Sequence, residues 1–419
     1  MAFSRLFAAV VAVSSFLIHS TLATYLTSST NLAVYWGQGP NQQRLRHFCE
    51  HTTMDIIPIG FIHLFPDQGA GGYPGSNFGN QCDGQVFVVD GEDTQLLSGC
   101  HQIVEDIPIC QRLGKTILLS LGGGTPDYKI ETGRSAVEFA DFLWGAFGPK
   151  TEEWGDNPRP FGDNVVDGFD FDIEHSGSFG KAPLTGFYSD ELTLLGYALM
   201  ANRFRQRFQE DPSKRYYLSA APQCRIPDEQ LHEAISKVSF DFIFVQFYNS
   251  DGCSARDWVN NPNSNGFTFD EWVKVIKNSP NPDAKLFIGL PASVEAAWLP
   301  KFYLSPSEVK PLIGHFMKKY PDTFGGIMLW EATGSERNQV DGMSYADNMK
   351  EILYSYGPPR PTTTSTVITR TTLSTTTKPT TTTEPTTTTT EEPTTTTSEK
   401  PTTTEESTTT TTEKPTTTE

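Results

Sequence analysis

Eight short apolar segments rich in β-branched and aromatic residues recur along the chain. They lie at 32–36, 55–65, 116–121, 165–173, 216–221, 241–248, 285–290 and 325–330. The segments between them have helical spacing of apolar residues, and two begin with start signals. Ser305 and Glu308, with Pro306 at the first helical position, form one capping box, and Thr268 and Glu271 form another. Strands that alternate with helices predict a parallel sheet, and eight such units predict a closed (β/α)₈ TIM barrel.

An open, doubly wound sheet is the alternative architecture for this pattern. Sheets of that kind carry a Gly-rich phosphate loop after the first strand, and no such loop follows residue 36. We therefore expect a single α/β barrel domain over residues 24–360. A long connection at 66–95, rich in Gly, Asn and Asp, follows the second strand and should lie on the C-terminal face, where barrel enzymes build their sites.

The two ends of the chain differ in composition from the predicted barrel. Residues 1–23 carry Arg5, an apolar stretch from Leu6 to Ile18 and then small residues, which predicts a signal peptide and an exported, soluble protein. No apolar stretch reaches the roughly 20 residues of a membrane-spanning helix, so no transmembrane segment is expected. Residues 361–419 are almost entirely Thr, Pro, Glu and Lys, which predicts a disordered, O-glycosylated stalk that contributes nothing to the fold.

The formal net charge of −18 belongs mostly to the predicted barrel, because residues 361–419 hold eight Glu against four Lys and Arg. An acidic domain repels nucleic acid and anionic membrane surfaces. The charge therefore favours a neutral or cationic substrate without identifying it.

The strongest chemical signal is a row of acidic residues at the end of the fourth apolar segment. Strand alternation over Asp167-Gly-Phe-Asp-Phe-Asp-Ile-Glu174 places Asp170, Asp172 and Glu174 on one face and apolar side chains on the other. An exposed strand with a solvated acidic face is the alternative, but a parallel barrel leaves no strand face open to water. Three neighbouring buried carboxyls cannot all be ionised, so at least one should have a raised pKa and keep its proton.

A protonated carboxyl at the C-terminal end of a barrel strand is placed to act as a general acid. The same carboxylates could in principle hold a cation. No second cluster of His or Asp completes a cation cage, so we expect neither a metal nor another cofactor.

With this motif the chain resembles glycoside hydrolase family 18, in particular its plant-type (class III), hevamine-like chitinases. The resemblance covers some 300 residues and is carried by segments in five further strands: Ala33-Val-Tyr-Trp-Gly-Gln38, Leu119-Ser-Leu-Gly-Gly-Gly124, Ala220-Ala-Pro-Gln-Cys224, Val245-Gln-Phe-Tyr-Asn249 and Gly326-Ile-Met-Leu-Trp330. It implies a barrel enzyme that hydrolyses β-1,4 linkages between N-acetylglucosamine units of chitin.

The resemblance also implies roles for the acidic row. Glu174 is expected to protonate the glycosidic oxygen, and Asp172 to orient the N-acetyl group of the substrate. Asp170 is expected to share a proton or a hydrogen bond with Asp172. Tyr248 is expected to donate to the acetyl oxygen. In the family that the chain resembles, this oxygen attacks the anomeric centre, so the mechanism is expected to be retaining and assisted by the substrate.

Three further residues are implied to bind substrate: Gln246 and Tyr35 would line the acetyl pocket, and Trp330 would form its apolar floor. Core packing is the alternative role for Trp330, because large aromatic residues are most often core. The Trp330–Glu331 peptide is expected to be cis. Ser120 and its glycines are interpreted as structural, because they let the third strand approach its neighbours.

Six cysteines in an exported chain indicate three disulfides, and their spacing alone permits 15 pairings. The order of elements around the barrel, together with the spacing shared with plant-type relatives, implies the pairs Cys49–Cys110, Cys82–Cys100 and Cys224–Cys253. This uses every cysteine inside the barrel, so no separate cysteine-rich chitin-binding module is expected.

The sequence thus predicts a secreted or cell-wall-associated, monomeric, endo-acting chitinase whose partners are chitin or chitooligosaccharides and not nucleic acid. Two alternatives stay open. One is an endo-β-N-acetylglucosaminidase that acts on N-glycan cores, and the other is a carbohydrate-binding barrel without activity. The presence of Glu174, Asp172 and Tyr248 favours catalysis over the second.

Overall fold

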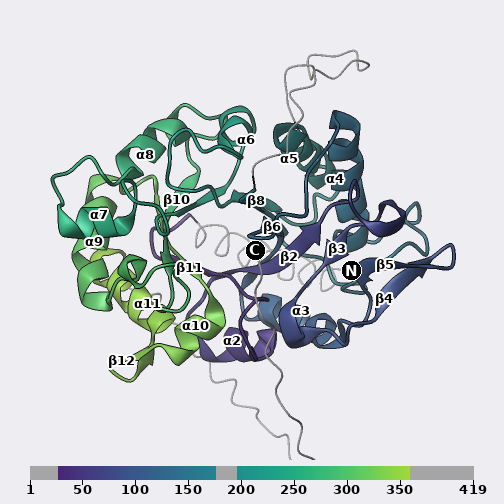
Figure 1. The fold of residues 1–419 in the computed structure, drawn as a ribbon, viewed down its shortest axis with the longest axis horizontal. Coiled ribbons are helices and arrows are strands. Elements are labelled where there is room, and N and C mark those ends of the chain that lie inside the picture. Colours follow the sequence, from purple (N-terminus) through teal and green to yellow (C-terminus); the bar gives the residue numbers. More distant parts are fainter. Residues whose placement is uncertain (1–26, 176–195, 359–419) are drawn as a thin grey trace, which may run out of the picture. The chain divides into compact units, whose positions relative to one another are not determined.

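A closed parallel barrel forms the centre of the protein (Figure 1). The computed structural model describes residues 27–175 and 196–358. The barrel strands are β1 (Asn31–Val34), β2 (Ile56–Leu64), β6 (Thr116–Gly123), β7 (Gly168–Ile173), β8 (Tyr217–Ala220), β9 (Phe242–Gln246), β10 (Lys285–Pro291) and β11 (Phe324–Trp330). Each pairs in parallel with its neighbour, and β1 pairs with both β11 and β2. The predicted (β/α)₈ barrel is confirmed, and the open sheet is excluded.

Helices surround the strands in Figure 1. They are α2 (Leu45–His51), α3 (His101–Arg112), α4 (Gly133–Phe147), α5 (Gly196–Phe208), α6 (His232–Lys237), α7 (Ala255–Asn260), α8 (Phe269–Lys277), α9 (Pro306–Lys319), α10 (Ala332–Arg337) and α11 (Tyr345–Tyr356), with 3₁₀ turns η1 (Ala70–Gly72), η2 (Gly79–Gln81) and η4 (Pro300–Phe302).

The two predicted helix starts have different outcomes. Glu308 accepts a hydrogen bond from the backbone N–H of Ser305 at 2.8 Å, so the capping box at the start of α9 is confirmed. α8 begins directly after Thr268, as predicted, but the capping box of Thr268 and Glu271 does not form. The Thr268 hydroxyl donates to the carbonyl of Cys224 at 2.5 Å, because a tertiary contact with the loop after β8 competes for the same oxygen.

The long connection after β2 contains more regular structure than its composition predicts. β3 (Gly75–Ser76) pairs antiparallel with β2, and β4 (Val86–Val89) and β5 (Glu92–Leu97) form a hairpin. A second short hairpin, β12 (Gln339–Val340) with β13 (Met343–Ser344), precedes α11. The connection is therefore a folded excursion, and the Cys82–Cys100 disulfide ties it to the start of α3.

The strands separate two hydrophobic cores. The outer core lies between strands and helices, where Phe169 of β7 stacks on Phe204 of α5 with ring centroids 4.2 Å apart. The inner core fills the barrel and is rich in aromatic side chains, among them Tyr35, Phe61 and Phe287. The predicted alternation of β7, apolar toward the helices and acidic toward the interior, is confirmed.

The three disulfides are Cys49–Cys110, Cys82–Cys100 and Cys224–Cys253, which are the expected pairs. Among the described residues, no helix combines the length and the apolar character needed to cross a membrane. The predicted signal peptide (1–23) and stalk (361–419) lie outside those residues.

A buried ion pair joins the last helix to the start of the barrel. Lys350 of α11 is 2% exposed, and its ammonium group contacts the carboxylate of Asp55 and donates to the carbonyl of Thr30 at 2.8 Å. The same Asp55 carboxylate accepts from the backbone N–H of Leu32 at 2.7 Å. Removing one partner of such a pair leaves a buried charge without compensation.

We expect Lys350→Met to lower the free energy of unfolding by about 3–5 kcal/mol at neutral pH, because Asp55 stays buried without its cation. Urea denaturation followed by circular dichroism measures the loss. Lys310→Met, at an exposed position on the outside of α9, is the matched control and should change stability little. Equal stability of the two variants would show that the ion pair does not hold α11 in place.

Candidate active site

The acidic row of β7 lies inside the barrel, and its deepest member is Asp170. This carboxyl is 0% exposed and accepts hydrogen bonds from three hydroxyl groups. Tyr35 donates at 2.7 Å and Ser120 at 2.6 Å to one oxygen, while Ser219 donates at 2.5 Å to the other. A proton or hydrogen bond shared between Asp170 and Asp172 stays a prediction, and the charge of Asp170 contributes to the raised pKa of Asp172.

Gln246 of β9 links the two outer carboxyls. Its side-chain nitrogen donates to Asp172 at 2.9 Å and to Glu174 at 3.0 Å, and lies 3.2 Å from the carbonyl of Ala221. The family resemblance implies that Gln246 lines the acetyl pocket. The structure shows a second contribution, since one amide group holds Asp172 and Glu174 at a fixed separation.

All three carboxyls have raised pKa values. Burial is the main cause for each of them. For Asp172 the charges of Glu174 and then Asp170 add to burial, and together they hold its pKa well above the usual range. For Glu174 the amide of Gln246 and the charge of His175 oppose burial without cancelling it. The row therefore retains protons at pH values where free carboxyls are ionised, as the sequence predicts.

An aromatic group closes the site on the side of β11. The Trp330 ring is stacked against Phe61 at 5.9 Å and lies 5.7 Å from Tyr35, while its outer surface lines two cavities. The Trp330 side chain thus packs against the inner core and also lines both cavities, and its role as the floor under a sugar stays a prediction. The Trp330–Glu331 peptide is cis, as expected. Tyr35 is 2% exposed and lies in the barrel interior.

Tyr248 lies at the end of β9 beside the acidic row. Burial is the main cause of its strongly raised pKa, and the charges of Asp172 and Glu174 add to it, so its hydroxyl stays protonated and can donate. The ring is 7% exposed and lines the cavity that also holds Glu174. No described residue forms a hydrogen bond with this hydroxyl, which leaves it available to a ligand.

Several residues that build the site were not identified from the sequence. Tyr128 accepts a hydrogen bond from the backbone N–H of Glu174 at 2.9 Å and donates to the carbonyl of Gly123 at 2.9 Å, so it fixes the end of β7. Ser219 completes the hydroxyl ring around the deepest carboxyl. Phe61, the partner of Trp330, follows a second cis peptide at Gly60–Phe61. No local motif marks these residues, because each contacts a part of the site that is distant in the sequence.

Ser120 does more than allow close approach of the strands, because its hydroxyl donates a hydrogen bond to Asp170. The structural interpretation holds for the glycine that follows Leu121. Gly122 has a φ of +103°, and a Cβ atom there would lie 2.4 Å from the carbonyl oxygen of Asp172. Only glycine allows β6 to approach β7 this closely.

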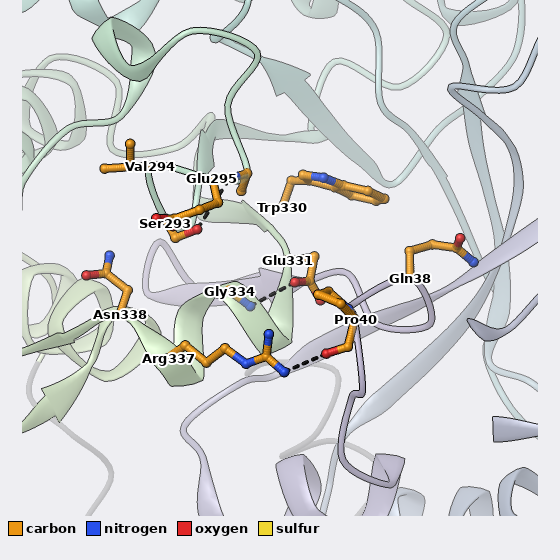
Figure 2. Close-up of a pocket in the computed structure, with 11 residues that line it drawn as sticks. Gln38, Pro40, Ser293, Val294, Glu295, Trp330, Glu331, Gly334, Arg337 and Asn338 are labelled. Atoms are coloured by element: carbon orange, nitrogen blue, oxygen red, sulfur yellow. Dashed lines mark hydrogen bonds between the residues drawn. The ribbon is translucent and has the colours of Figure 1, made fainter. Parts of the chain in front are cut away.

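Two cavities meet at Trp330. One, of about 510 Å³, is lined by Glu174, Gln246 and Tyr248 together with residues after β8 and β9. The other, of about 600 Å³, extends toward Gln38 and α10 (Figure 2). Both have Trp330 and Ala296 in their walls. A long, narrow ligand can therefore lie across the indole with parts in both cavities.

The second cavity has a fixed polar wall at the start of α10. Figure 2 shows the Glu331 carboxylate turned toward the helix, where it accepts from the backbone N–H groups of Thr333 and Gly334 at 2.9 and 2.7 Å. Arg337 crosses the cavity floor and donates to the carbonyl of Pro40 at 2.5 Å. This carboxylate is committed to capping the helix and is not free to attack a substrate.

The raised pKa of Asp172 predicts a specific dependence of stability on pH. The folded protein keeps this proton at pH values where the unfolded chain releases it, so the contribution of Asp172 is fully present below about pH 4 and is lost as pH rises through its folded pKa. Asp172→Asn removes this loss. We therefore compare the free energy of unfolding of the variant with that of the natural protein. The difference should move in favour of the variant by about 1 kcal/mol or more as the pH is raised from 4 to 7.

Thermal and urea unfolding at both pH values measure this difference. Asp90→Asn, at the exposed turn of the β4–β5 hairpin, is the control and should show no such trend. A stability difference for Asp172→Asn that is constant with pH would mean that the pKa of this carboxyl is not raised in the folded state.

Comparisons with known proteins agree with this geometry. The family described as glycosyl hydrolases family 18 matches residues 31–302. The chain is 58% identical over 337 residues to endochitinase A of Aspergillus niger, covering 80% of this chain and 25% of that protein. It is 57% identical over 348 residues to endochitinase A1 of Aspergillus fumigatus, covering 83% and 37%. The chain thus spans between a quarter and a half of the length of the curated relatives it matches.

Two solved structures show the same fold at 28% identity and a TM-score of 0.58. One is the ICChI chitinase of Ipomoea carnea, which covers 77% of this chain and 99% of its own. The other is the xylanase and α-amylase inhibitor protein XAIP-II of Scadoxus multiflorus, which covers 76% and 97%. Barrel, acidic row and family match coincide in one region, and the chain belongs to glycosyl hydrolases family 18.

Proposed function

We propose that this barrel is an endo-acting chitinase that hydrolyses β-1,4 linkages between N-acetylglucosamine units by a retaining, substrate-assisted mechanism. The observation that carries the proposal is Glu174, a carboxyl with a raised pKa that lines a cavity and is joined through Gln246 to a second buried carboxyl, Asp172. The names of the endochitinases that share 57–58% of the aligned residues support the same activity.

The cavity residues restrict how the anomeric carbon can be attacked. Retaining glycosidases of the ordinary kind hold two carboxyls about 5–5.5 Å apart on opposite sides of the bond. Of the described residues that line the Glu174 cavity, no other is Asp or Glu, and Asp172 comes from the same strand. A nucleophile from the substrate itself satisfies this geometry, and the acetyl oxygen of its 2-acetamido group is the available one.

In the proposed first step, the acetyl oxygen bonds to the anomeric carbon while the glycosidic bond breaks and the Glu174 proton moves to the departing oxygen. The product is an oxazolinium ion and a shortened chain. Asp172 accepts from the acetamide N–H and Tyr248 donates to the acetyl oxygen, so both hold the nucleophile in place. Trp330 supports the apolar face of the sugar.

In the second step, Glu174 acts as the base. Its carboxylate takes a proton from a water molecule. The oxygen of this water bonds to the anomeric carbon from the face that the departing chain had occupied. The bond from the acetyl oxygen then breaks and restores the acetamide. Two inversions give net retention, and Glu174 recovers the proton that it donated.

The two alternatives share parts of this arrangement. The inhibitor protein XAIP-II matches the barrel as well as the chitinase does, so the fold alone does not decide between catalysis and binding. Glu174 in its cavity favours catalysis. An endo-β-N-acetylglucosaminidase would use the same residues on another substrate, and parallel hydrolysis assays on soluble chitin oligomers and a high-mannose glycoprotein separate the two.

We also propose that the protein is exported and acts as a monomer on chitin outside the cell or at the cell wall. The composition of residues 1–23 supports export, and three disulfides in the barrel fit an oxidising compartment. In this proposal residues 24–360 carry the activity and residues 361–419 form the glycosylated stalk.

Glu174→Gln keeps the shape of the side chain but removes the transferable proton. We expect kcat on chitin oligomers to fall by at least about 10²–10⁴, with binding of the oligomer largely unchanged. Glu152→Gln, at an exposed position before β7, is the control. Near-normal turnover by Glu174→Gln would show that another group is the acid.

The nucleophile is tested separately by the substrate. Oligomers in which hydroxyl replaces the 2-acetamido group should not be cleaved, because they lack the attacking oxygen. The first product from acetylated chitin oligomers should be the β-anomer, which NMR detects before mutarotation. Prompt release of the α-anomer would contradict the retaining mechanism even if Glu174 is the acid.

A further inference from the structure

One loop at the mouth of the site exposes large apolar side chains. Within residues 292–299, which follow β10, Trp298 is 86% exposed, Leu299 is 51% exposed and Val294 is 41% exposed. Trp298 has the highest exposed fraction among the large hydrophobic residues that the structure describes. Apolar surface gathered at one place on a soluble protein commonly marks a binding site.

The loop forms one side of both cavities. Trp298 lines the cavity that contains Glu174, and Val294 lines the other. Ala296, between them in sequence, lines both, as Trp330 does across from it. Figure 2 shows Val294 and Glu295 on the side of the cavity away from Gln38. The exposed indole therefore belongs to the same cleft as the acidic row.

The position of the acid decides which part of the ligand meets Trp298. In the proposed reaction the attacked sugar lies over Trp330, and Glu174 protonates the oxygen that joins it to the departing chain. A ligand that runs from the other cavity across Trp330 therefore meets Glu174 at the cleaved bond and continues past Trp298. Trp298 is in the wall of the cavity that holds Glu174, and the other cavity contains neither residue. Trp298 therefore faces the leaving chain.

Contacts with the neighbouring loop hold Trp298 in place. Its backbone N–H donates to the side-chain oxygen of Asn249 at 2.9 Å, and Asn249 has a φ of +57°, which Asn adopts more readily than most residues. Lys301 pairs with Asp251 at 2.6 Å, and Arg256 donates to the carbonyl of Lys301 at 2.7 Å. These contacts hold the backbone that carries the indole in one position before a ligand binds.

We propose that Trp298 is the stacking platform for the leaving chain of the polysaccharide and contacts the apolar face of an N-acetylglucosamine unit beyond the cleaved bond. This inference rests on the proposed function. The flat indole matches the face of a pyranose ring, where C–H groups point outward, and the substrate units carry no charge. Gln223 and Arg225, both exposed in the same cavity wall, provide donors for the hydroxyl groups at the edge of the ring.

The platform has a consequence for substrate preference. Its contact is made only by chains that extend beyond the cleaved bond, so long chains gain binding energy that short ones lack. Trp298 should thus direct the enzyme to cut within chains, leaving several units on the departing side.

The test measures binding and cleavage separately. Binding of chitohexaose is measured by calorimetry in the Glu174→Gln background, with and without Trp298→Ala and Trp298→Phe. We expect about tenfold weaker binding with Trp298→Ala and partial recovery with Trp298→Phe. Tyr356→Ala removes another exposed aromatic ring, on α11 and outside both cavities, and should bind as the background protein does.

Cleavage is followed with Glu174 intact. Trp298→Ala should shift the chitohexaose products toward cuts that leave fewer units on the departing side. Hydrolysis of chitohexaose by the natural protein tests the proposed function by itself, so its failure is distinguishable from failure of this inference. Unchanged affinity together with an unchanged product pattern would overturn the platform. Unchanged affinity with a lower sedimentation coefficient for Trp298→Ala would also overturn it, because a second copy of the chain would then cover the loop.

Discussion

The site is organised by the burial of three carboxyl groups from one strand inside a barrel. Low polarisability and mutual repulsion oppose their ionisation, so the surrounding strands must supply hydrogen-bond donors or leave protons in place. The structure does both, and the deepest carboxyl has more hydrogen-bond donors around it than the other two. The deepest carboxyl, Asp170, receives three hydroxyls, the middle one shares an amide, and the outermost opens into a cavity. This arrangement leaves Glu174 as the one carboxyl of the row that lines the cavity.

Much of the fold follows from local pattern, and the residues show why. Eight apolar segments mark all eight barrel strands, because a parallel barrel buries both faces of each strand and leaves continuous apolar runs in the sequence. The same pattern fails for the excursion after β2, whose short strands β3, β4 and β5 are recognisable only through their partners. The capping box at Thr268 fails for a similar reason, since its sequence context fits a helix cap while a distant carbonyl binds its hydroxyl.

The residues of the site can be divided in the same way, by whether a local pattern in the sequence identifies them. Asp170, Asp172 and Glu174 were identified because strand alternation places them on one face, and that rule is local. Roles for Tyr248, Gln246 and Trp330 came from the family resemblance. Tyr128 and Ser219 escaped both kinds of reasoning, because they support the row from the loop after β6 and from β8 through hydrogen bonds with no sequence signature. The exposure of Trp298 depends on contacts of its loop with residues distant in the sequence, such as Asn249, which no local pattern indicates.

The Cys224–Cys253 disulfide joins the loops after β8 and β9, and these loops carry Arg225 and Asn249 of the cavity that holds Glu174. The carbonyl of Cys224 is also held by Thr268 and by the indole N–H of Trp272, at 2.5 and 3.2 Å. One rim of the cleft is therefore fixed by a covalent link and by two hydrogen bonds to the same residue, none of which involves β7. The shape of that rim and the position of the acidic row thus depend on separate contacts.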